Sequence, residues 1–378
     1  MNKIRIGVVF GGRSGEHEIS IRSAKTVIEQ IDKEKYEVFP IAITKDGSWL
    51  NPAESLSLFP EKTQEVLSDK IEFFPKSTVA LLGDTKYKGL TKLEATGGEE
   101  RLSPLDVIFP VLHGTYGEDG TVQGLFEMAG IPYVGGGVLA SACGMDKVVM
   151  KTLFRDAELP ICKYVWFLRS EWESARDEAV IKQIEAKLGY PCFVKPANLG
   201  SSVGVSRADD AESLRDAINL AAEYDRKIIV EEALDMREIE CAVIGNDKPQ
   251  ASLPGEYIIH DDSKKFLDYT EKYTGTGNND FVVPALISEE LVKKIQQMAI
   301  SAFKAVDGSG LARVDFFLRN DNGALLVNEI NTLPGLTDAS GFPKMWAGTG
   351  MGFSKVIDKL IDLAFERHAD KMRNKTSF

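Results

Sequence analysis

The chain has 378 residues, a formal net charge of −12, 43% apolar residues and 27% charged residues. This length is more than one hydrophobic core usually serves, so we expect two or three domains, and the composition excludes a fibrous or disordered protein. The negative charge argues against a general nucleic-acid or anionic-membrane surface, although a few clustered cations can still hold an anionic ligand.

Because the N-terminus leads directly into a strand, we expect no signal peptide, and no apolar run reaches the roughly 18 residues of a membrane span. The four cysteines form no C-x-x-C pair and have apolar neighbours; they are Cys143, Cys162, Cys192 and Cys241. We therefore expect reduced thiols in a cytoplasmic protein that contacts neither membrane nor nucleic acid.

The first domain is expected at residues 1–135, as an open parallel sheet with helices. Strands and helices alternate along this part of the chain, which is typical of a parallel sheet. The apolar, β-branched strands are 4–10, 37–43 and 106–112, and the helices are 20–31 and 121–130. The segment 45–104 is polar and irregular, so we expect loops and small edge elements there.

Two α+β units follow, expected at residues 136–234 and 235–378. The first begins with a long helix over 138–157 and an acidic helix over 171–188. Two strands joined by the loop NLGSSVG come next, and a helix over 211–224 leads to the strand KIIVEEAL. The last unit contains the strand IECAVIG, the loop DYTEKYTGTGNNDFVVPA, a helix over 289–305, the strands LARVDFFLR and ALLVNEIN, and a helix over 353–365.

The strands LARVDFFLR and ALLVNEIN, joined by a short turn, carry the densest set of chemically active residues. Period-two alternation places Arg313 and Asp315 on one face, and Glu329 and Asn331 on one face of the partner strand. Two carboxylates and an amide oxygen on facing strands form a hard oxygen cage for Mg²⁺, and the guanidinium could neutralise an oxyanion. A surface hairpin is the alternative, but these charges interrupt apolar strands, and buried charges need a partner or a metal.

The loop NLGSSVG is suited to an anion. Lys195 ends the strand before it, Gly200 and Gly204 let backbone N–H groups approach closely, and Ser201 and Ser202 add hydroxyls. The pattern is not a Walker loop, because no G-K-[ST] follows and no helix opens here. We interpret it as a flexible hairpin over a triphosphate, with a plain turn as the alternative.

Further nucleotide-binding candidates flank this loop. The strand IIVEEAL could read an adenine through an open backbone edge, and Glu238 could hold the ribose hydroxyls. Lys147 lies on the helix that opens the second domain, where a solvated lysine is the alternative. The loop around Lys272 is about 18 residues long, which is typical of a lid or of disorder, and Tyr273 favours a lid that excludes water.

These residues together resemble the ATP-grasp fold: Lys147, Lys195 with GSSVG, EEAL with Glu238, then Asp315 and an E-x-N motif. More narrowly, GGRSGEHEIS, HGTYGEDGTVQG, KPANLGSSVGVS, DYTEKY and NEINTLPGLT resemble the D-alanine–D-alanine ligase family, in collinear order over essentially the whole chain. The implied fold class is α/β with an α+β C-terminal part, an ATP-grasp of three domains whose last two units clamp ATP.

The resemblance implies ATP as the nucleotide and assigns its ligands. The residues implied at the phosphates are Lys147, Lys195, Ser201, Ser202 and Lys272. The residues implied at the adenine and ribose are Glu231, Glu232, Ala233, Leu234 and Glu238. Two Mg²⁺ ions are implied, which Mn²⁺ can replace: one between Asp315 and Glu329, the other between Glu329 and Asn331.

The resemblance also implies catalytic and substrate-binding residues, which are Glu16, His113, Ser201, Tyr273, Arg313, Gly335 and Ser340. Glu16 would bind the ammonium group of the first D-alanine, and Ser340 the carboxylate of the second. Arg313 and the backbone at Gly335 would stabilise the tetrahedral oxyanion. The stretch LTDASGF differs from the expected family spelling, particularly in the glycine after Ser340.

The implied reaction joins two D-alanine molecules through an acyl phosphate, for peptidoglycan synthesis, in a homodimeric enzyme. The substrates supply the nucleophiles, so the chain needs no G-x-S-x-G, Cys/His pair or H-E-x-x-H motif. D-serine or D-lactate as acceptor, or another carboxylate–amine pair, are the near alternatives; Tyr273 favours an amino-acid acceptor, and D-serine differs by one hydroxyl.

The opening turn FGGRSGEHE separates the more distant alternatives. A dehydrogenase needs G-x-G-x-x-G after its first strand and an acidic residue about 20 positions later, and this turn lacks that spacing. A non-catalytic nucleotide-binding protein would leave the metal-ligand set unexplained. A carboxylate in this turn would repel a pyrophosphate, so we expect Glu16 to bind an ammonium group and to face Ser201 and Tyr273 across a cleft. The alternative is a first-turn residue that meets the helix dipole.

Overall fold

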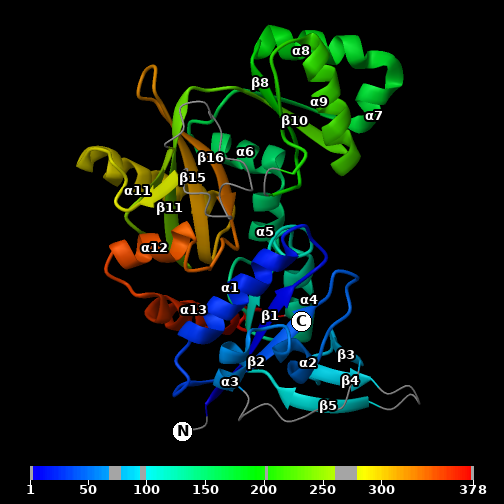
Figure 1. The fold of residues 1–378 in the computed structure, drawn as a ribbon, viewed down its shortest axis with the longest axis vertical. Coiled ribbons are helices and arrows are strands. Elements are labelled where there is room, and N and C mark those ends of the chain that lie inside the picture. The colour runs from blue at the N-terminus through cyan, green and yellow to red at the C-terminus, as the bar shows by residue number, and fades with distance from the viewer. Residues whose placement is uncertain (1–2, 68–77, 94–98, 201–202, 260–278, 376–378) are drawn as a thin grey trace.

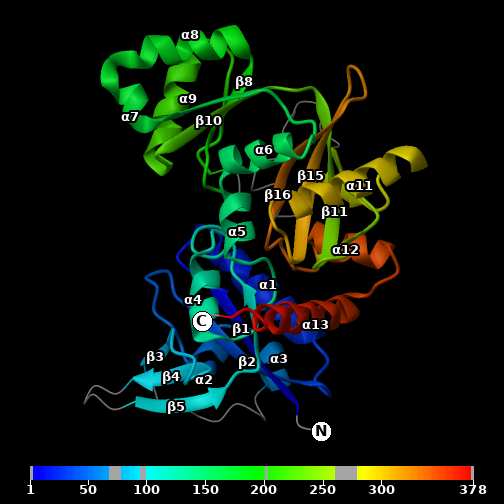
Figure 2. The same cartoon turned by 180° about the vertical axis from the view of Figure 1, so that it is seen from behind.

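A computed structural model describes residues 3–67, 78–93, 99–200, 203–259 and 279–375. These residues form four sheets, arranged along the long axis of the molecule (Figures 1 and 2). Each of the three predicted domains, at residues 1–135, 136–234 and 235–378, contains at least one sheet of its own. The boundaries between these domains stay predictions. Within the described residues, no helix combines the length and apolarity that crossing a membrane requires.

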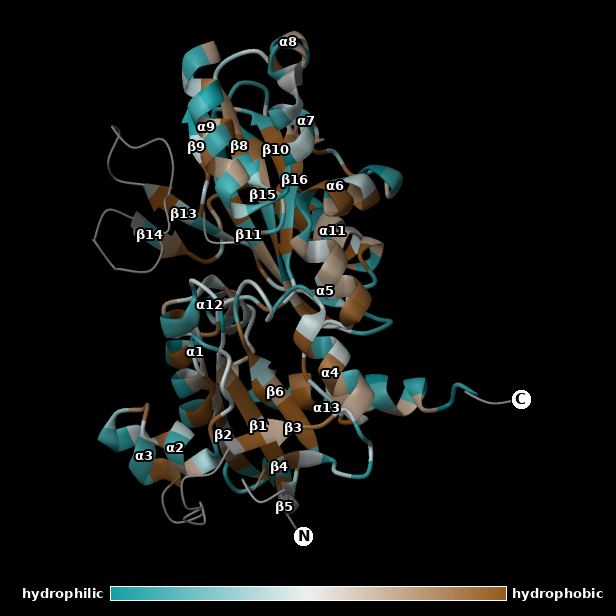
Figure 3. Cartoon of the chain, turned by 90° about the vertical axis from the view of Figure 1, so that its right-hand side faces the viewer, coloured by the Kyte–Doolittle hydropathy of each residue, from teal (hydrophilic) through white to brown (hydrophobic). Residues whose placement is uncertain are grey.

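The N-terminal sheet is parallel, as predicted, with the strand order β2-β1-β6. Its strands are β1 (Ile4–Gly11), β2 (Tyr36–Ile43) and β6 (Val107–Val111). The helices beside it are α1 (His17–Gln30), α4 (Thr121–Ala129) and the C-terminal α13 (Phe353–Lys371). Figure 3 shows hydrophobic residues concentrated in β1 and β6, typical of strands that are buried on both faces.

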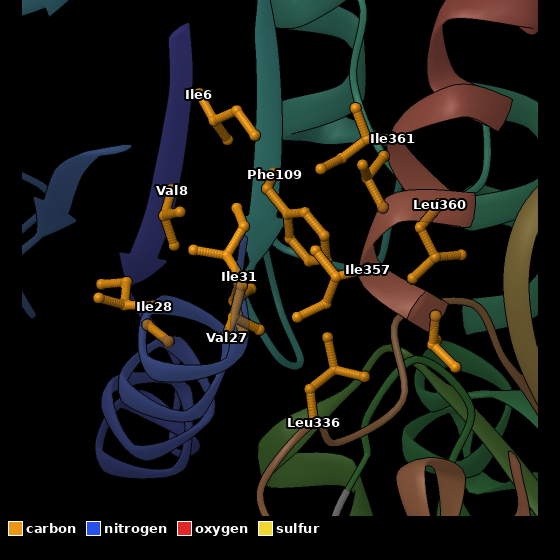
Figure 4. Close-up of a cluster of buried hydrophobic side chains, with 14 of the residues drawn as sticks. Ile6, Val8, Val27, Ile28, Ile31, Phe109, Leu336, Ile357, Leu360 and Ile361 are labelled. Carbon is orange, nitrogen blue, oxygen red and sulfur yellow. The ribbon is translucent and has the colours of Figure 1, made fainter. Parts of the chain in front are cut away.

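One face of this sheet is covered by α1 and α13. Ile6 and Phe109 of the strands pack with Val27 of α1 and with Ile357 and Leu360 of α13, all of them buried (Figure 4). The last helix therefore closes the chain back onto the first sheet. On the other face, α4 packs against residues of the segment 45–104, which was predicted to be irregular.

That segment contains two short helices and a separate antiparallel sheet. The helices are α2 (Pro52–Leu56) and α3 (Glu61–Leu67), and the strands are β3 (Thr78–Leu81), β4 (Gly89–Leu93) and β5 (Glu99–Pro104). The elements are small, as expected, but the strands pair with one another instead of extending the main sheet.

The predicted helix over 138–157 is wrong in one respect: it is two helices, α5 (Val138–Met145) and α6 (Lys147–Asp156). Asp146 separates them, with an extended ψ of 104°, and caps α6 by accepting hydrogen bonds from the backbone N–H groups of Val148 and Val149 at 3.0 and 3.1 Å. An aspartate in this position satisfies donors that would otherwise be buried without partners.

The second unit is an antiparallel sheet of strand order β7-β10-β8-β9. The strands are β7 (Tyr164–Leu168), β8 (Cys192–Pro196), β9 (Ser206–Ala208) and β10 (Lys227–Glu232), and the helices are α8 (Asp177–Lys187) and α9 (Ala211–Tyr224). The predicted acidic helix over 171–188 is three pieces: α7 (Arg169–Glu171), a π-helical turn (Trp172–Arg176) and α8. β10 lies between β7 and β8, so the predicted open strand edge at IIVEEAL is wrong.

The third unit is a six-stranded sheet with the order β14-β13-β11-β15-β16 and β12 beside β11. The strands are β11 (Met236–Gly245), β12 (Gln250–Ala251), β13 (Gly255–Ile259), β14 (Asn279–Val282), β15 (Gly310–Arg319) and β16 (Leu325–Asn331). Its helices are α11 (Glu289–Ala305) and α12 (Gly341–Gly348). The apolar face packs on α6 and α11 through residues such as Val314 and Phe316, and the polar face is directed into the site described next.

Candidate active site

A cavity lies between the N-terminal parallel sheet and the sheets of the second and third units, and most of the predicted site residues line it. Those present in its lining are Glu16, His113, Lys147, Lys195, Glu231, Glu232, Leu234, Glu238, Arg313, Asp315, Glu329, Asn331 and Gly335. Ala233 is absent from this lining, and Ser340 lines an adjoining cavity that shares Arg313 and Gly335. Ser201, Ser202, Lys272 and Tyr273 lie outside the described residues.

The metal-ligand candidates face each other across β15 and β16. Asp315 is in register with Glu329, and Arg313 with Asn331. A β-bulge follows Asp315, so that residues before and after it keep different registers with β16. The side-chain amide of Asn331 donates to Asp315 Oδ2 at 3.1 Å. Two carboxylates and an amide at one point of a sheet supply the oxygen ligands that Mg²⁺ prefers.

Arg313 is held by two carboxylates. Its Nε and Nη2 donate to the two oxygens of Asp315 at 2.7 and 2.6 Å, and its Nε lies 3.3 Å from Oε1 of Glu240. Glu240 is 3% exposed and stands opposite Asp315 on β11. Glu240 was not among the predicted site residues, although a carboxylate inside the apolar strand IECAVIG, two residues after Glu238, was a signal.

The phosphate-binding candidates Lys147 and Lys195 reach the cavity from α6 and β8. Lys147 Nζ donates to the carbonyl of Leu199, in the loop NLGSSVG, at 2.6 Å and lies 3.9 Å from Glu329 Oε2. Lys195 Nζ donates to Glu231 Oε2 at 2.6 Å. A second lysine, Lys151, contacts the other oxygen of Glu231. Lys151 was not predicted to belong to the site, because a lysine on a helix is usually exposed to solvent and its sequence context gave no sign of burial.

The structure does not support the predicted way of binding adenine, through an open backbone edge of the strand that carries Glu231. Because β10 is paired on both sides, the backbone of Glu231 is engaged with Tyr164 and Phe193. Beyond the strand, Ala233 N–H donates to the carbonyl of Pro191 at 3.2 Å. Leu234 and Glu238 do line the cavity, so the stretch after β10 carries the remaining candidates for the base and ribose.

Glu16 enters the cavity from the turn between β1 and α1. Gly11 and Gly12 have φ angles of +88° and +96°, which only glycine adopts readily, and a Cβ on Gly11 would come within 2.3 Å of Ile43 O. A Cβ placed on Gly200 would lie 3.9 Å from both carboxylate oxygens of Glu16. Gly200 thus lies close to Glu16, while the expected contacts with Ser201 and Tyr273 fall outside the described residues.

A second carboxylate, Glu118, lines the same end of the cavity and was missed by sequence reasoning. It accepts hydrogen bonds from the backbone N–H groups of Gly114 at 2.7 Å and Leu333 at 3.3 Å. Burial raises the pKa of Glu118 to about 8, with a further contribution from the charge of Glu16. Burial also raises the pKa of Glu16 to about 7, against the opposing effects of Arg313 and Lys147. A cationic group bound at this end of the cavity would favour the ionised forms of both carboxyl groups, so the site is suited to an ammonium group.

His113 is a buried neighbour of these carboxylates. Its Nδ1 lies 3.1 Å from the carbonyl of Leu333, so Nδ1–H donates, and its Nε2 lies 3.1 Å from Ser23 Oγ, whose hydroxyl can then donate to it. Burial lowers the pKa of His113 to about 4, and the positive charge of Arg313 acts in the same direction. The imidazole is thus neutral near pH 7 and fixes the wall of the cavity.

The adjoining cavity contains Ser340 at the start of α12. The Ser340 hydroxyl lies 2.7 Å from Thr337 Oγ1 and accepts from Thr337 N–H at 3.1 Å. The unexpected Gly341 has a physical reason here, since a Cβ on it would come within 2.5 Å of Glu240 Oε2 and 2.8 Å of the Phe281 ring. The backbone at this point must be bare for the buried Glu240 to fit.

Comparison with known proteins gives a consistent result along the whole chain. A family model described as D-ala D-ala ligase N-terminus matches residues 5–136, and one described as D-ala D-ala ligase C-terminus matches residues 153–362. A D-alanine--D-alanine ligase of Ruminiclostridium cellulolyticum is 48% identical over 100% of this chain and 99% of its own length. The ligase of the same name from Natranaerobius thermophilus is 46% identical over 100% and 99%.

Solved structures agree with these relatives. The VanG D-Ala:D-Ser ligase of Enterococcus faecalis superposes with a TM-score of 0.81 at 38% identity, over 96% of this chain and 100% of that one. The D-alanine-D-alanine ligase of Coxiella burnetii gives a TM-score of 0.81 at 35% identity, over 99% and 97%.

Proposed function

The chain belongs to the D-alanine–D-alanine ligase family, and from this premise we propose that it uses ATP to join two D-alanine molecules, for peptidoglycan precursor synthesis. One observation carries the proposal: a single cavity brings together Glu16, the lysines Lys147 and Lys195, and the oxygen ligands on β15 and β16. An ammonium site, a phosphate site and a metal site are the three parts that such a ligation needs.

The reaction has two steps. The carboxylate of the first D-alanine attacks the γ-phosphate of ATP, which releases ADP and forms an acyl phosphate. The neutral amine of the second D-alanine then attacks the acyl carbon, and phosphate leaves. Positioning and electrostatic stabilisation therefore do most of the catalytic work.

Each part of the site has a role in these steps. Glu16 holds the ammonium group of the first D-alanine at the protected end of the cavity. Lys147 and Lys195 bind the phosphates, while Leu234 and Glu238 face the base and ribose. Arg313 and the backbone at Gly335, which are shared by the two cavities, stabilise the tetrahedral oxyanion, and Ser340 receives the carboxylate of the second D-alanine.

The oxygen donors Asp315, Glu329 and Asn331 fit two Mg²⁺ ions, with Mn²⁺ as a substitute. When bound, the ions would neutralise charge on the phosphate oxygens. The fit rests on the register of β15 with β16 and on the hard-oxygen character of the three side chains. Lys147, at 3.9 Å from Glu329 Oε2, adds positive charge at the same point.

A phosphate-release assay tests the proposed function. Purified protein with ATP and Mg²⁺ is given D-alanine alone, D-alanine with D-serine, or D-alanine with D-lactate, and the products are identified by mass spectrometry. We expect phosphate release and D-alanyl-D-alanine with D-alanine alone. The names of the sequence relatives favour D-alanine as acceptor, although the VanG structure belongs to a D-Ala:D-Ser ligase. No phosphate release with D-alanine would refute the proposal.

We further propose a homodimer that acts in the cytoplasm. Helices α4 and α5 expose the apolar side chains of Met128, Val138 and Leu139, which are 68%, 41% and 58% exposed. Apolar side chains of this kind support a contact face for a second copy. The four free cysteines and the need for ATP support a reducing, ATP-containing compartment. Light scattering would test the dimer and cell fractionation the location; a monomer at micromolar concentration, or an exported protein, would contradict them.

A further inference from the structure

We propose that Lys151 is a positioning residue for the triphosphate site, which acts by neutralising Glu231 so that Lys195 keeps its charge for the phosphates. The inference rests on the proposed use of ATP. Lys151 lies one turn after Lys147 on α6, but it is 1% exposed and does not line the cavity. It therefore acts through other residues.

Three charged groups form a row from the interior to the cavity. Lys151 Nζ lies 2.9 Å from Glu231 Oε1, and Lys195 Nζ lies 2.6 Å from Glu231 Oε2. The Glu231 side chain is 3% exposed, whereas Lys195 reaches the cavity. Burial by itself would raise the pKa of Glu231, but the two ammonium groups outweigh burial and hold that pKa well below its usual range. Glu231 is therefore an anion throughout the pH range in which the enzyme works.

The charge balance explains why a second lysine is needed. Lys195 and Glu231 alone would be a neutral pair and would offer a triphosphate little attraction. With Lys151 behind it, the group of three carries a net charge of +1, and that charge is presented where Lys195 meets the cavity. Stability is a weaker explanation, because buried ion pairs can often be replaced by packed apolar residues at little loss.

Lys151 also joins the elements that carry the other ligands. Its Nζ donates to the carbonyl of Asn328 at 3.2 Å, at the bulge of β16 and next to the metal-ligand candidate Glu329. One ammonium group thus connects α6, which carries Lys147, with β10 and β16. The contact orients the strand end beside Glu329 as well as balancing the charge of Glu231.

Direct nucleotide binding tests the inference without requiring turnover. We would titrate the full-length protein with Mg²⁺ and adenylyl imidodiphosphate, and separately with adenosine, using calorimetry. We expect Lys151→Met to weaken binding of the triphosphate analogue about tenfold, the loss of one nearby charge, and to leave binding of the uncharged adenosine unchanged. Lys151→Arg, which keeps the charge, should bind the analogue within about twofold of wild type.

A second substitution separates charge balance from simple structural damage. The double variant Lys151→Met/Glu231→Gln again has a net charge of +1 at Lys195, so it should recover most of the lost affinity for the analogue. Arg367→Met is the matched control, because Arg367 is a partly buried cation of α13 that donates to the carbonyl of Tyr133 and to Ser309, and it does not line the cavity. We expect it to lower the melting temperature without changing analogue binding.

Two results would overturn the inference: wild-type affinity in Lys151→Met, or a loss of affinity that Glu231→Gln does not relieve. If Lys151→Met does not fold, Lys151→Gln with and without Glu231→Gln gives the same comparison. Failure of the proposed ligase function would be visible separately, as wild-type protein that binds the analogue but releases no phosphate with D-alanine.

Discussion

Arg313 and Asp315, two residues apart on β15, form a bidentate ion pair with N–O distances of 2.7 and 2.6 Å. Both residues have proposed roles that require them to make other contacts, Asp315 with Mg²⁺ and Arg313 with the oxyanion. When a cation occupies the oxygens of Asp315, the guanidinium needs a second anchor. Glu240, buried and 3.3 Å from Arg313 Nε, is placed to supply it.

Glu240→Gln should therefore lower kcat by about 10- to 100-fold, since charge-assisted hydrogen bonds to a guanidinium contribute about 1.5–3 kcal/mol. The KM for ATP should stay within about twofold of wild type, because Glu240 is not placed among the nucleotide ligands. Steady-state kinetics with varied ATP measures both. Glu256→Gln is the matched control: Glu256 is a buried carboxylate of the same sheet that pairs with Arg237, and its loss should reduce stability but not kcat. An unchanged kcat in Glu240→Gln would contradict this role.

Glu329→Gln should abolish turnover, to below about 1% of wild type, since Glu329 is proposed to bridge both metal ions. Any residual activity should need a higher Mg²⁺ concentration to reach half of its maximum. EDTA should abolish the activity of the wild-type enzyme. Asp321→Asn is the control, because Asp321 lies in the turn of the same hairpin and pairs only at the surface with Arg319. Near-normal activity of Glu329→Gln at low Mg²⁺ would refute the metal assignment.

Local patterns predicted the half of the site that lies on single elements. Period-two alternation correctly placed Arg313 and Asp315 on one face of β15, and Glu329 and Asn331 on one face of β16, because alternation depends only on the strand itself. The register that pairs Asp315 with Glu329 comes from the structure. The parallel N-terminal sheet was predictable for a similar reason, from the regular alternation of strands and helices.

The residues that were missed depend on packing between distant elements. Lys151 is buried because α6 packs beside β10 and β16, and Glu118 is partly buried where the backbone of Leu333 lies against its loop. The strand order of the second unit, in which β10 lies between β7 and β8, could likewise not be predicted from local sequence patterns. Asp146 was a readable helix-capping signal, and it was overlooked inside an otherwise continuous helical pattern.

Gly341→Ala should impair the acceptor step. Its Cβ would collide with Glu240 Oε2 and with the Phe281 ring, so Glu240 or the start of α12 must shift, and Ser340 with it. We expect kcat to fall about tenfold or more, as small displacements of catalytic groups do, and the KM for the second D-alanine to rise. Initial rates over a range of D-alanine concentrations measure both.

Gly352→Ala is the control for Gly341→Ala. Gly352 precedes α13 with a φ of −63°, and a Cβ on it meets nothing within 4 Å. Its kinetics should match wild type. Equal effects from the two substitutions would show that the contact with Glu240 is irrelevant.

Glu16→Gln should lose ligase activity and should be more stable than wild type at high pH. The pKa of Glu16 is raised from 4.5 to about 7 by burial, so between these values the folded protein keeps a proton that the unfolded chain has lost. Wild-type unfolding free energy should therefore fall as pH rises through this window. The glutamine of the variant does not ionise, so the variant avoids this loss. Its unfolding free energy should equal that of wild type near pH 4.5 and exceed it by about 3 kcal/mol above pH 8. Its ligase activity should be lost, because the ammonium group of D-alanine has no counter-charge.

Urea unfolding without substrates, from pH 5 to 8.5, measures the difference in unfolding free energy between Glu16→Gln and wild type. Glu18→Gln, an exposed change in the first turn of α1, should show no such gain. Identical pH profiles for Glu16→Gln and wild type would rule out a protonated Glu16 in the folded protein.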